Sequence, residues 1–251
     1  MTSIASARSI ENNNVTSLWK AQRFISVRPV EYPQKSIYQD RRPSRFARSE
    51  PASSLGKRVF DLTVATLALL FFTPLFVAIV VAIKVTSRGP VFFRQYRYGY
   101  RNRLFKIYKF RSMYNSAGDV AGIKQTVHGD SRITAVGRVL RKTSLDELPQ
   151  LINVIKGDMS LVGPRPHVPG MLAANVLYED LVPYYLQRHI ARPGITGLAQ
   201  VSGCRGSTVE PNSAIKRIDY DLDYIENWSL KTDVKVLVQT VRREFLSGSG
   251  S

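Results

Sequence analysis

An uncharged and almost wholly apolar stretch dominates the hydrophobic pattern of this chain. From Leu62 to Ile83 the sequence reads LTVATLALLFFTPLFVAIVVAI, and a helix needs ~20 apolar residues to cross the hydrocarbon core of a bilayer. The stretch begins far from the N-terminus and no small-residue cleavage site follows it, which distinguishes it from a secretory signal peptide. The pattern therefore predicts a membrane helix within residues 57–87.

Two features bear on the path of this helix. Thr73 and Pro74 lie at its middle, where a proline removes a backbone hydrogen bond and bends the helix axis. Of the 36 Lys and Arg residues, 11 lie in residues 1–58 and the other 25 in residues 84–251, so the positive-inside rule draws both flanks toward the cytoplasm. These features fit a re-entrant helix that returns to the same face, and they also fit a kinked spanning helix.

A carboxylate stands where this helix begins. Asp61 follows Arg58 in the segment KRVFDL, and an acidic side chain at a membrane interface requires a partner. We expect Asp61 to pair with Arg58, or with a group on another chain, in a structural role.

The pattern changes after the apolar stretch. Two runs rich in aromatic and β-branched residues, Val91–Tyr98 and Leu104–Arg111, flank a turn at Gly99–Arg103, which is typical of a β-hairpin. Asn102 lies in this turn, and asparagine tolerates the left-handed backbone conformation that a tight turn requires. The sequence therefore predicts a hairpin here.

Helical periodicity returns further along the chain, between loops rich in glycine and proline. The predicted helices lie at 148–156, 170–190, 213–226 and 230–246. The predicted fold is α+β, with a membrane-embedded, proline-kinked helix at 57–87 and a small cytoplasmic domain of helices and a short β-hairpin at 88–246. Residues 1–56 lack a sustained apolar period and are expected to form a basic, mostly disordered tail, and residues 247–251 a flexible one.

Charge and composition narrow the classes of function. The net charge of +17 implies an acidic partner, which can be nucleic acid, a phosphorylated small molecule or an anionic membrane surface. Cys204 is the only cysteine, so neither an intrachain disulfide nor a cysteine-based zinc site is expected. The three histidines lie far apart, without metal-binding spacing. A Mg²⁺ site remains compatible with the sequence, because it needs only one or two carboxylates and substrate phosphates.

The candidate chemistry is concentrated around two neighbouring carboxylates, Asp146 and Glu147, in the segment KTSLDELPQL. Pro149 suits the first position of a helix, which would place both carboxylates at the positive end of that helix, where they stay ionised. An ionised carboxylate can attack phosphorus to form an acyl phosphate, and its neighbour can hold Mg²⁺ against a diphosphate.

A structural alternative exists for these residues, because Ser144 and Glu147 also match a capping box. Nearby cations favour the chemical interpretation. Arg165 lies in the stiff segment GPRP, which can present its guanidinium to a phosphate, and KFR contributes Lys109 and Arg111. Arg141 is a further candidate for binding a diphosphate.

Several motifs occur in one order and resemble a known family. They are KRVFDL at 57–62, YKFRSM at 108–113, TSLDELPQL at 143–151, GDMSLVGPRP at 157–166 and RPGITGLAQVSG at 192–203. The sequences and the order of these motifs resemble those of the monotopic polyprenyl-phosphate phosphoglycosyl transferases, bacterial sugar transferases that start exopolysaccharide and glycan assembly. The resemblance runs from about Lys57 to Phe245.

The resemblance implies a reaction and roles for individual residues. Asp146 is expected to be the nucleophile and Glu147 the Mg²⁺ ligand in the transfer of hexose-1-phosphate from a UDP-sugar to polyprenyl (undecaprenyl) phosphate, with release of UMP. It also implies that the helix broken at Thr73 and Pro74 is re-entrant, that membrane lipid surrounds it, and that the catalytic domain lies on the cytoplasmic face of the bacterial inner membrane. No nucleic-acid partner is expected.

The sequence leaves the roles of several other residues open. The segment RPGITGLAQ is expected to form the floor of the nucleotide site, or else to be a turn-rich connector; its candidate residues are Arg192, Gly194, Thr196 and Gln200. His189 is a candidate general base or a packing residue. The segment YDLDYIENWSLKTDVKVL resembles members that use hexose-1-phosphate donors and favours UDP-glucose or UDP-galactose over a UDP-N-acetyl sugar. A non-catalytic, membrane-anchored scaffold for anionic ligands is the alternative from another class.

Overall fold

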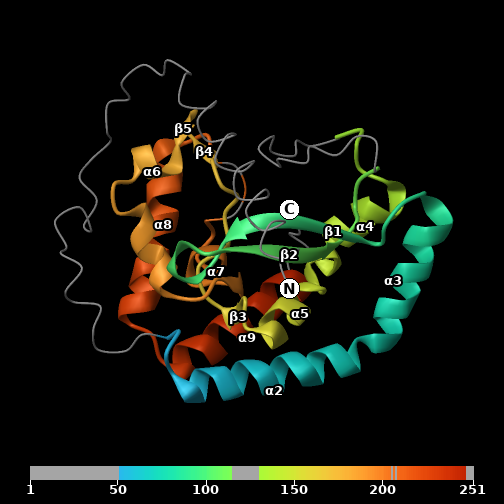
Figure 1. Ribbon diagram of the computed structural model, residues 1–251, viewed down its shortest axis with the longest axis horizontal. Coiled ribbons are helices and arrows are strands. Elements are labelled where there is room, and N and C mark those ends of the chain that lie inside the picture. Colours follow the sequence, from blue (N-terminus) through green and yellow to red (C-terminus); the bar gives the residue numbers. More distant parts are fainter. Residues whose placement is uncertain (1–50, 115–129, 205, 207, 247–251) are drawn as a thin grey trace, which may run out of the picture. The chain divides into compact units, whose positions relative to one another are not determined.

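The apolar stretch forms two helices that meet at a bend of 60° (Figure 1). The computed structural model describes residues 51–114, 130–204, 206 and 208–246, and in it α2 (Leu55–Phe71) is followed by α3 (Thr73–Thr86). Pro74 has no N–H to donate to Leu70 O, and Thr73 Oγ1 donates to the neighbouring carbonyl, Leu69 O, at 2.8 Å. Within the described part no single helix has the length and hydropathy to cross a bilayer, but this bent pair meets both criteria together. The predicted kink is confirmed.

The predicted hairpin is also confirmed. Strands β1 (Phe92–Tyr98) and β2 (Leu104–Phe110) pair antiparallel, and Asn102 adopts the left-handed conformation with φ of 61°. The side chain of Asn153 continues the hydrogen bonding at the edge of β2, because its Oδ1 accepts from Tyr108 N at 2.9 Å and its Nδ2 donates to Lys106 O at 2.8 Å. Helix α5 (Gln150–Lys156), which carries Asn153, is thereby fixed against the hairpin.

The C-terminal helices follow the prediction, but the region before them does not. Helices α8 (Pro211–Glu226) and α9 (Leu230–Leu246) confirm two of the predicted segments, and α5 confirms a third. The prediction of one helix at 170–190 is wrong. Those residues form β4 (Leu172–Ala173), β5 (Val176–Leu177), α6 (Tyr178–Leu181) and the 3-10 helix η5 (Tyr185–Ile190).

Two local effects interrupt that predicted helix. Ala174 and Asn175 have φ of 50° and 64°, which is the backbone of a tight hairpin turn. Pro183 then ends α6, because the residue before a proline is driven out of the helical region, and Val182 is extended there.

An apolar cluster joins the bent helix pair to the rest of the domain. Its buried members are Ile79 and Ile83 of α3, Phe110 of β2 and Leu140 of α4 (Ala135–Lys142). Partly buried side chains that pack against it are Leu75, Phe76, Val80, Val91, Phe92, Val136, Leu145 and Leu148. Because Leu145 and Leu148 bracket Asp146 and Glu147 in the sequence, the turn that carries the two carboxylates adjoins the cluster to which α3 contributes.

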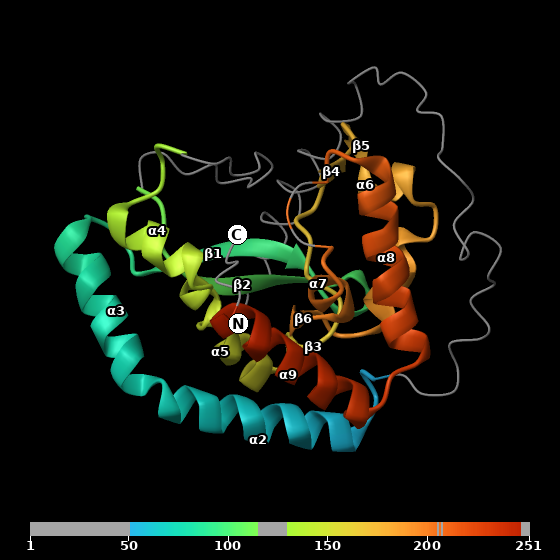
Figure 2. The ribbon, with the colours of Figure 1, turned by 180° about the vertical axis from the view of Figure 1, so that it is seen from behind.

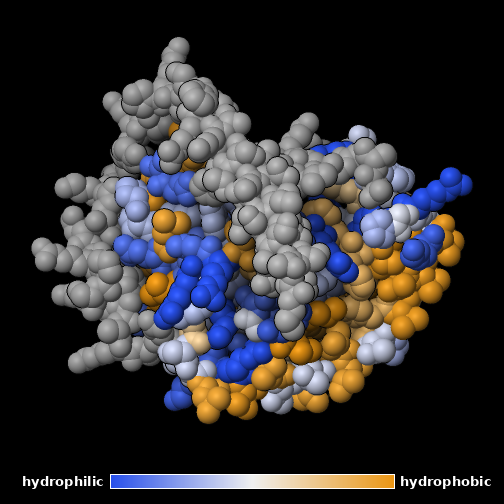
Figure 3. Space-filling view, in the orientation of Figure 1, coloured by the Kyte–Doolittle hydropathy of each residue, from blue (hydrophilic) through white to orange (hydrophobic). Residues whose placement is uncertain are grey.

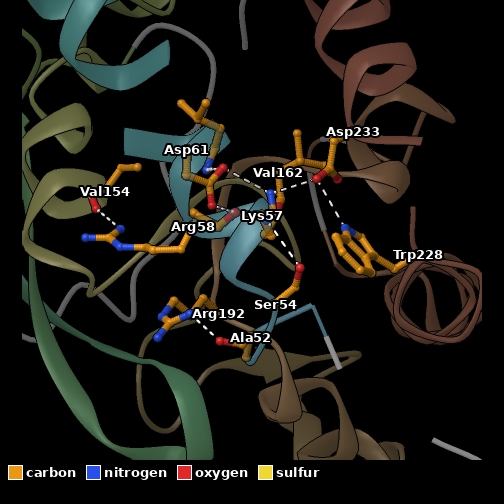
Figure 4. A network of polar contacts seen from close by, with 12 residues as sticks. Ala52, Ser54, Lys57, Arg58, Asp61, Val154, Val162, Arg192, Trp228 and Asp233 are labelled. Atoms are coloured by element: carbon orange, nitrogen blue, oxygen red, sulfur yellow. Dashed lines mark hydrogen bonds and ion pairs between the residues drawn. The ribbon is translucent and has the colours of Figure 1, made fainter. Parts of the chain in front are cut away.

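The first turn of α2 is anchored by a buried ionic network (Figure 4). Lys57 Nζ lies 3.1 Å from Asp61 Oδ1 and 2.9 Å from Asp233 Oδ2 of α9. Ser160 Oγ also donates to Asp61, and Trp228 Nε1 to Asp233. Accordingly, Figures 1 and 2 both show α9 along the same side of α2 as α5.

The expected pairing of Asp61 with Arg58 is therefore wrong. On the helix, Lys57 rather than Arg58 points at Asp61, at the (i, i+4) spacing that suits an ion pair. Arg58 instead donates to Val154 O at 2.6 Å and Ile155 O at 2.8 Å. These carbonyls belong to the last turn of α5, where helix carbonyls lack the usual donors from a following turn.

Replacement of Lys57 by methionine tests the importance of the ionic network. Lys57→Met leaves Asp61 and Asp233 buried without their cation and should lower the free energy of unfolding by about 3–5 kcal/mol. Thermal unfolding in detergent measures the change. Lys231→Met, on the exposed side of α9, is the matched control and should change the stability by less than about 0.5 kcal/mol. Equal stability of the two variants would contradict the anchoring role.

Candidate functional site

Asp146 and Glu147 lie on a tight 3-10 turn, η4 (Leu145–Glu147), immediately before α5. Ser144 begins this turn in the left-handed conformation, with φ of 54°, and its side chain makes no capping hydrogen bond there. The capping-box alternative is therefore wrong. The carboxylate of Glu147 is bound instead by two cations from distant parts of the chain.

The carboxylate of Glu147 is held on both oxygens. Its Oε1 accepts from Lys109 Nζ of β2 at 2.6 Å and from Arg165 Nη2 at 2.7 Å, and its Oε2 accepts from Arg165 Nη1 at 3.2 Å. Burial alone raises the pKa of Glu147, but the guanidinium of Arg165 and the ammonium of Lys109 outweigh burial and hold the pKa well below its usual value. Glu147 is therefore ionised, and its charge is compensated.

The carboxylate of Asp146, in contrast to that of Glu147, is not ion-paired with a described residue. It is only 8% exposed, and no described residue forms a hydrogen bond or ion pair with its carboxylate. Burial raises the pKa of Asp146 above its usual value; the cation of Lys109 opposes this rise, and the charge of Glu147 adds to it. Two adjacent carboxylates whose pKa values shift in opposite directions are suited to different chemical roles.

Arg141 is the third predicted cation that the structure brings to the dyad. It lies near the end of α4, and its Nε donates to Ser112 Oγ at 2.9 Å. Its charge lowers the pKa of Asp146 against the effect of burial. Lys109, Arg141 and Arg165 thus surround the two carboxylates with three positive charges.

The sequence reasoning missed a fourth cation, Arg97 of β1. Burial and the charge of Arg165 lower the pKa of Arg97 to about 10, whereas the charge of Glu147 raises it, so its guanidinium is near both. The hairpin register pairs Phe93 with Lys109. Because strand side chains alternate between faces, Arg97 shares a face with Lys109, and this alternation was the signal available in the sequence.

Two of the predicted cations lie elsewhere and act in the fold. Arg111 is buried, and its guanidinium donates to Ser87 O at 2.8 Å and Arg88 O at 3.0 Å, just beyond the end of α3. Arg192 donates to Ala52 O at 2.6 Å. Both guanidinium groups satisfy backbone carbonyls and hold neighbouring segments together.

The predicted nucleotide floor packs into the interior. Gly194 and Thr196 lie on β6 (Gly194–Thr196), which pairs with β3 (Ser160–Val162), and a Cβ on Gly194 would lie 2.1 Å from the nitrogen of Gly163. Thr196 Oγ1 bonds Thr240 Oγ1 at 2.7 Å, and Gln200 is buried on α7 (Leu198–Val201). This geometry favours the connector interpretation.

His189 is a packing residue. Its ring is tilted against that of Tyr98 and edge-on to that of Tyr185, and its Nδ1 hydrogen-bonds the side chain of Asn102. Burial lowers its pKa to about 3, so the ring is a poor base at neutral pH.

The dyad can accept a divalent cation only together with a ligand that brings negative charge. The described residues contain no group of three or more His, Cys, Asp or Glu side chains placed to hold a metal. Glu147 Oε2 accepts a single hydrogen bond, which leaves it one lone pair for a metal. The surrounding cations, Lys109, Arg141 and Arg165, repel a free metal ion, and a bound diphosphate would compensate them.

Comparison with known proteins identifies the family. The family model described as bacterial sugar transferase matches residues 52–247. The chain is 49% identical over 194 residues to the "Exopolysaccharide production protein PSS" of Rhizobium leguminosarum bv. phaseoli, covering 77% of this chain and 97% of that protein.

Two longer relatives match the same region. A "UDP-glucose:undecaprenyl-phosphate glucose-1-phosphate transferase" of Xanthomonas campestris pv. campestris is 49% identical over 189 residues, covering 75% of this chain and 38% of that protein. A "UDP-N-acetylgalactosamine-undecaprenyl-phosphate N-acetylgalactosaminephosphotransferase" of Aeromonas hydrophila is 43% identical over 201 residues, covering 80% of this chain and 46% of that protein. The chain therefore spans less than half the length of these two relatives.

These matches confirm the resemblance drawn from the motifs. The dyad turn, its cations and the GPRP loop all lie inside the matched region. From Ala52 to near its C-terminus, this chain is a member of the bacterial sugar transferase family.

Proposed function

We propose that this protein transfers hexose-1-phosphate from a UDP-sugar to a polyprenyl phosphate, producing a polyprenyl diphosphosugar and UMP. One observation carries the proposal: of two adjacent carboxylates, Glu147 is neutralised by Lys109 and Arg165, whereas Asp146 is buried among cations without a partner in the described part of the chain. An unpaired carboxylate in a positive environment is suited to attack a phosphorus atom whose oxygens are negatively charged.

The reaction proceeds in two displacements at the same phosphorus. A carboxylate oxygen of Asp146 bonds to the sugar-linked phosphorus, the bond from that phosphorus to the bridging oxygen breaks, and UMP leaves with the electron pair. An oxygen of the polyprenyl phosphate then attacks the same phosphorus and displaces Asp146 as a free carboxylate. Arg165 and Lys109 stabilise the charge on the transferring group, because phosphoryl transfer depends mainly on positioning and electrostatics.

Glu147 would hold Mg²⁺ through Oε2, which accepts a single hydrogen bond. When bound there, Mg²⁺ neutralises charge on the diphosphate. Lys109 and Arg165, which pair with Glu147 in the structure, would then be able to contact the donor phosphates.

UDP-glucose is our proposed donor, supported by the name of the Xanthomonas relative. The Aeromonas relative is named for UDP-N-acetylgalactosamine at a similar identity, so a UDP-N-acetyl sugar is the second candidate. The names of these relatives and that of the Rhizobium protein support undecaprenyl phosphate as acceptor and exopolysaccharide assembly as the process that begins here.

The bent helix pair is proposed to enter the cytoplasmic membrane of a bacterium and return to its inner face. Hydrophobic residues cover the outer rim formed by α2 and α3 in Figure 3. Highly exposed members are Leu67, Leu70, Phe71, Val77, Val81 and Val85. Such a large exposed apolar surface is unfavourable in water and fits contact with lipid. The cluster with Leu145 and Leu148 would then place the dyad close to a lipid-borne acceptor.

Substitution of the nucleophile tests the proposed chemistry. With Mg²⁺, polyprenyl phosphate and a panel of UDP-sugars, the membrane-extracted protein should release UMP. Asp146→Asn should reduce the rate by at least about 1,000-fold, because an amide cannot form the acyl phosphate. Release of UDP would indicate direct glycosyl transfer instead, and binding of lipid without release of any nucleotide would favour the scaffold alternative.

The rate of UMP release should also respond to pH through Asp146. The reaction needs the carboxylate, and burial raises its pKa, so the acidic limb of the kcat/KM profile should lie above the ordinary aspartate value of about 3.9. Arg141→Met removes a cation that lowers this pKa and should move the limb to higher pH. Arg138→Met, an exposed position on the same helix, is the control. Identical limbs in both variants would contradict the assignment.

The topology can be measured directly by cysteine labelling. In a Cys204→Ser background, single cysteines at Ser53 and Arg88 flank the bent pair. Both should react with an impermeant reagent only from the cytoplasmic side. Pro74→Ala restores a backbone donor for Leu70 O and should favour a straighter helix. Labelling of the two flanks from opposite sides in the parent would rule out re-entry.

A further inference from the structure

The loop that carries Arg165 is held in place by hydrogen bonds from residues outside the loop. Pro164 and Pro166 have no N–H groups, so the loop has little capacity for backbone hydrogen bonds of its own. Each of its four successive carbonyls nevertheless accepts a hydrogen bond. The donors are Gly194 N to Pro164 O at 2.9 Å, Arg188 Nη2 to Arg165 O at 2.6 Å, Arg97 Nη1 to Pro166 O at 3.3 Å and Tyr98 N to His167 O at 3.0 Å.

Arg188 makes the shortest of these contacts and belongs to a buried ion pair. It lies on η5, and its Nε and Nη2 donate to Asp221 Oδ2 of α8 at 3.0 Å and 2.7 Å. The side chains of Arg188 and Asp221 are 0% and 2% exposed. The same Nη2 that binds Asp221 also binds the carbonyl of Arg165.

Stability alone is a weak explanation for this pair. Removing two charges from water costs about as much as their attraction returns, and well-packed hydrophobic residues often serve a buried position equally well. The contact with Arg165 O offers a specific explanation. A guanidinium presents several donors in a rigid plane, so Asp221 can fix Arg188 while Arg188 fixes the backbone of the loop.

We propose that Arg188, oriented by Asp221, is a positioning residue that sets the reach of Arg165 to Glu147 and to the donor diphosphate. The contacts form one continuous series, from Asp221 through Arg188 and the backbone of Arg165 to the carboxylate of Glu147. This inference rests on the proposed function, because it assigns a purpose to the geometry of the transferase site.

Kinetics of paired substitutions test whether Arg188 acts through Arg165. Arg188→Lys replaces the planar guanidinium with a single ammonium group, and Asp221→Asn removes the negative charge that orients Arg188. Each should lower kcat for UMP release by about 10- to 100-fold, the cost expected from a displacement of about 1 Å in a positioning group. In an Arg165→Ala background, the same substitutions should change kcat by less than about threefold, because interacting residues are non-additive.

Asp233→Asn provides the matched control. Asp233 is also a buried, ion-paired carboxylate, but its partners are Lys57, Tyr224 and Trp228, and none of these three is hydrogen-bonded to residues 164–167. Its effect on kcat should be the same factor with and without Arg165. The inference is overturned if Arg188→Lys and Asp221→Asn lower kcat by the same factor in the Arg165→Ala background as in the parent.

A chemical measurement separates this inference from the proposed reaction. Arg165 is 40% exposed, so phenylglyoxal modification of its guanidinium can be followed by peptide mass spectrometry without any turnover. Arg188→Lys and Asp221→Asn should accelerate modification of Arg165 toward the rate in Glu147→Gln, where the ion pair is broken, and Asp233→Asn should not. Unchanged modification in the first two variants overturns the inference. Absence of UMP release with accelerated modification refutes only the reaction.

Discussion

The ion pairs of Glu147 are the interaction on which the site depends. Its carboxylate joins three parts of the chain that are distant in sequence, because Lys109 comes from the hairpin, Arg165 from the GPRP loop and Glu147 itself from the 3-10 turn. The two cations satisfy Glu147 and leave Asp146 alone among positive charges. The positions of Lys109 and Arg165 thus explain why, among the described residues, Glu147 is ion-paired and the adjacent Asp146 is not.

The same turn couples the site to the apolar helix pair. Leu145 and Leu148 pack against the cluster that contains Ile79, Ile83 and Phe110, so the side chains on either side of the dyad share one apolar cluster with α3. At the other end of the pair, Lys57 links α2 to α9 through Asp233. In our proposal, a lipid acceptor within the membrane would therefore meet the nucleophile next to the helices that enter the bilayer.

Features that depend on residues close together in the sequence were predicted correctly. Features that depend on contacts between distant residues were not. The bend at Pro74, the hairpin and the position of the dyad before a helix each follow from local chemistry. Which basic residue pairs with Asp61 depends on the packing of α2 against α9, and this choice was mispredicted. Arg97 was missed although strand alternation puts it on the same face as Lys109, because its approach to Glu147 depends on how the hairpin packs. The segment that contains Gly194 was left open between a nucleotide floor and a connector, and the close packing of Gly194 against a neighbouring backbone favours the connector.

Transfer of label from the donor to Asp146 tests the central claim most directly. The protein would be mixed with UDP-glucose carrying ³²P in the sugar-linked phosphate, without acceptor, and quenched rapidly before peptide mapping. Our account predicts that the label is retained on the peptide containing Asp146, that UMP is released in equal amount, and that added polyprenyl phosphate removes the label. Release of UMP only when the lipid is present, with no labelled protein at any time, would contradict a nucleophilic Asp146.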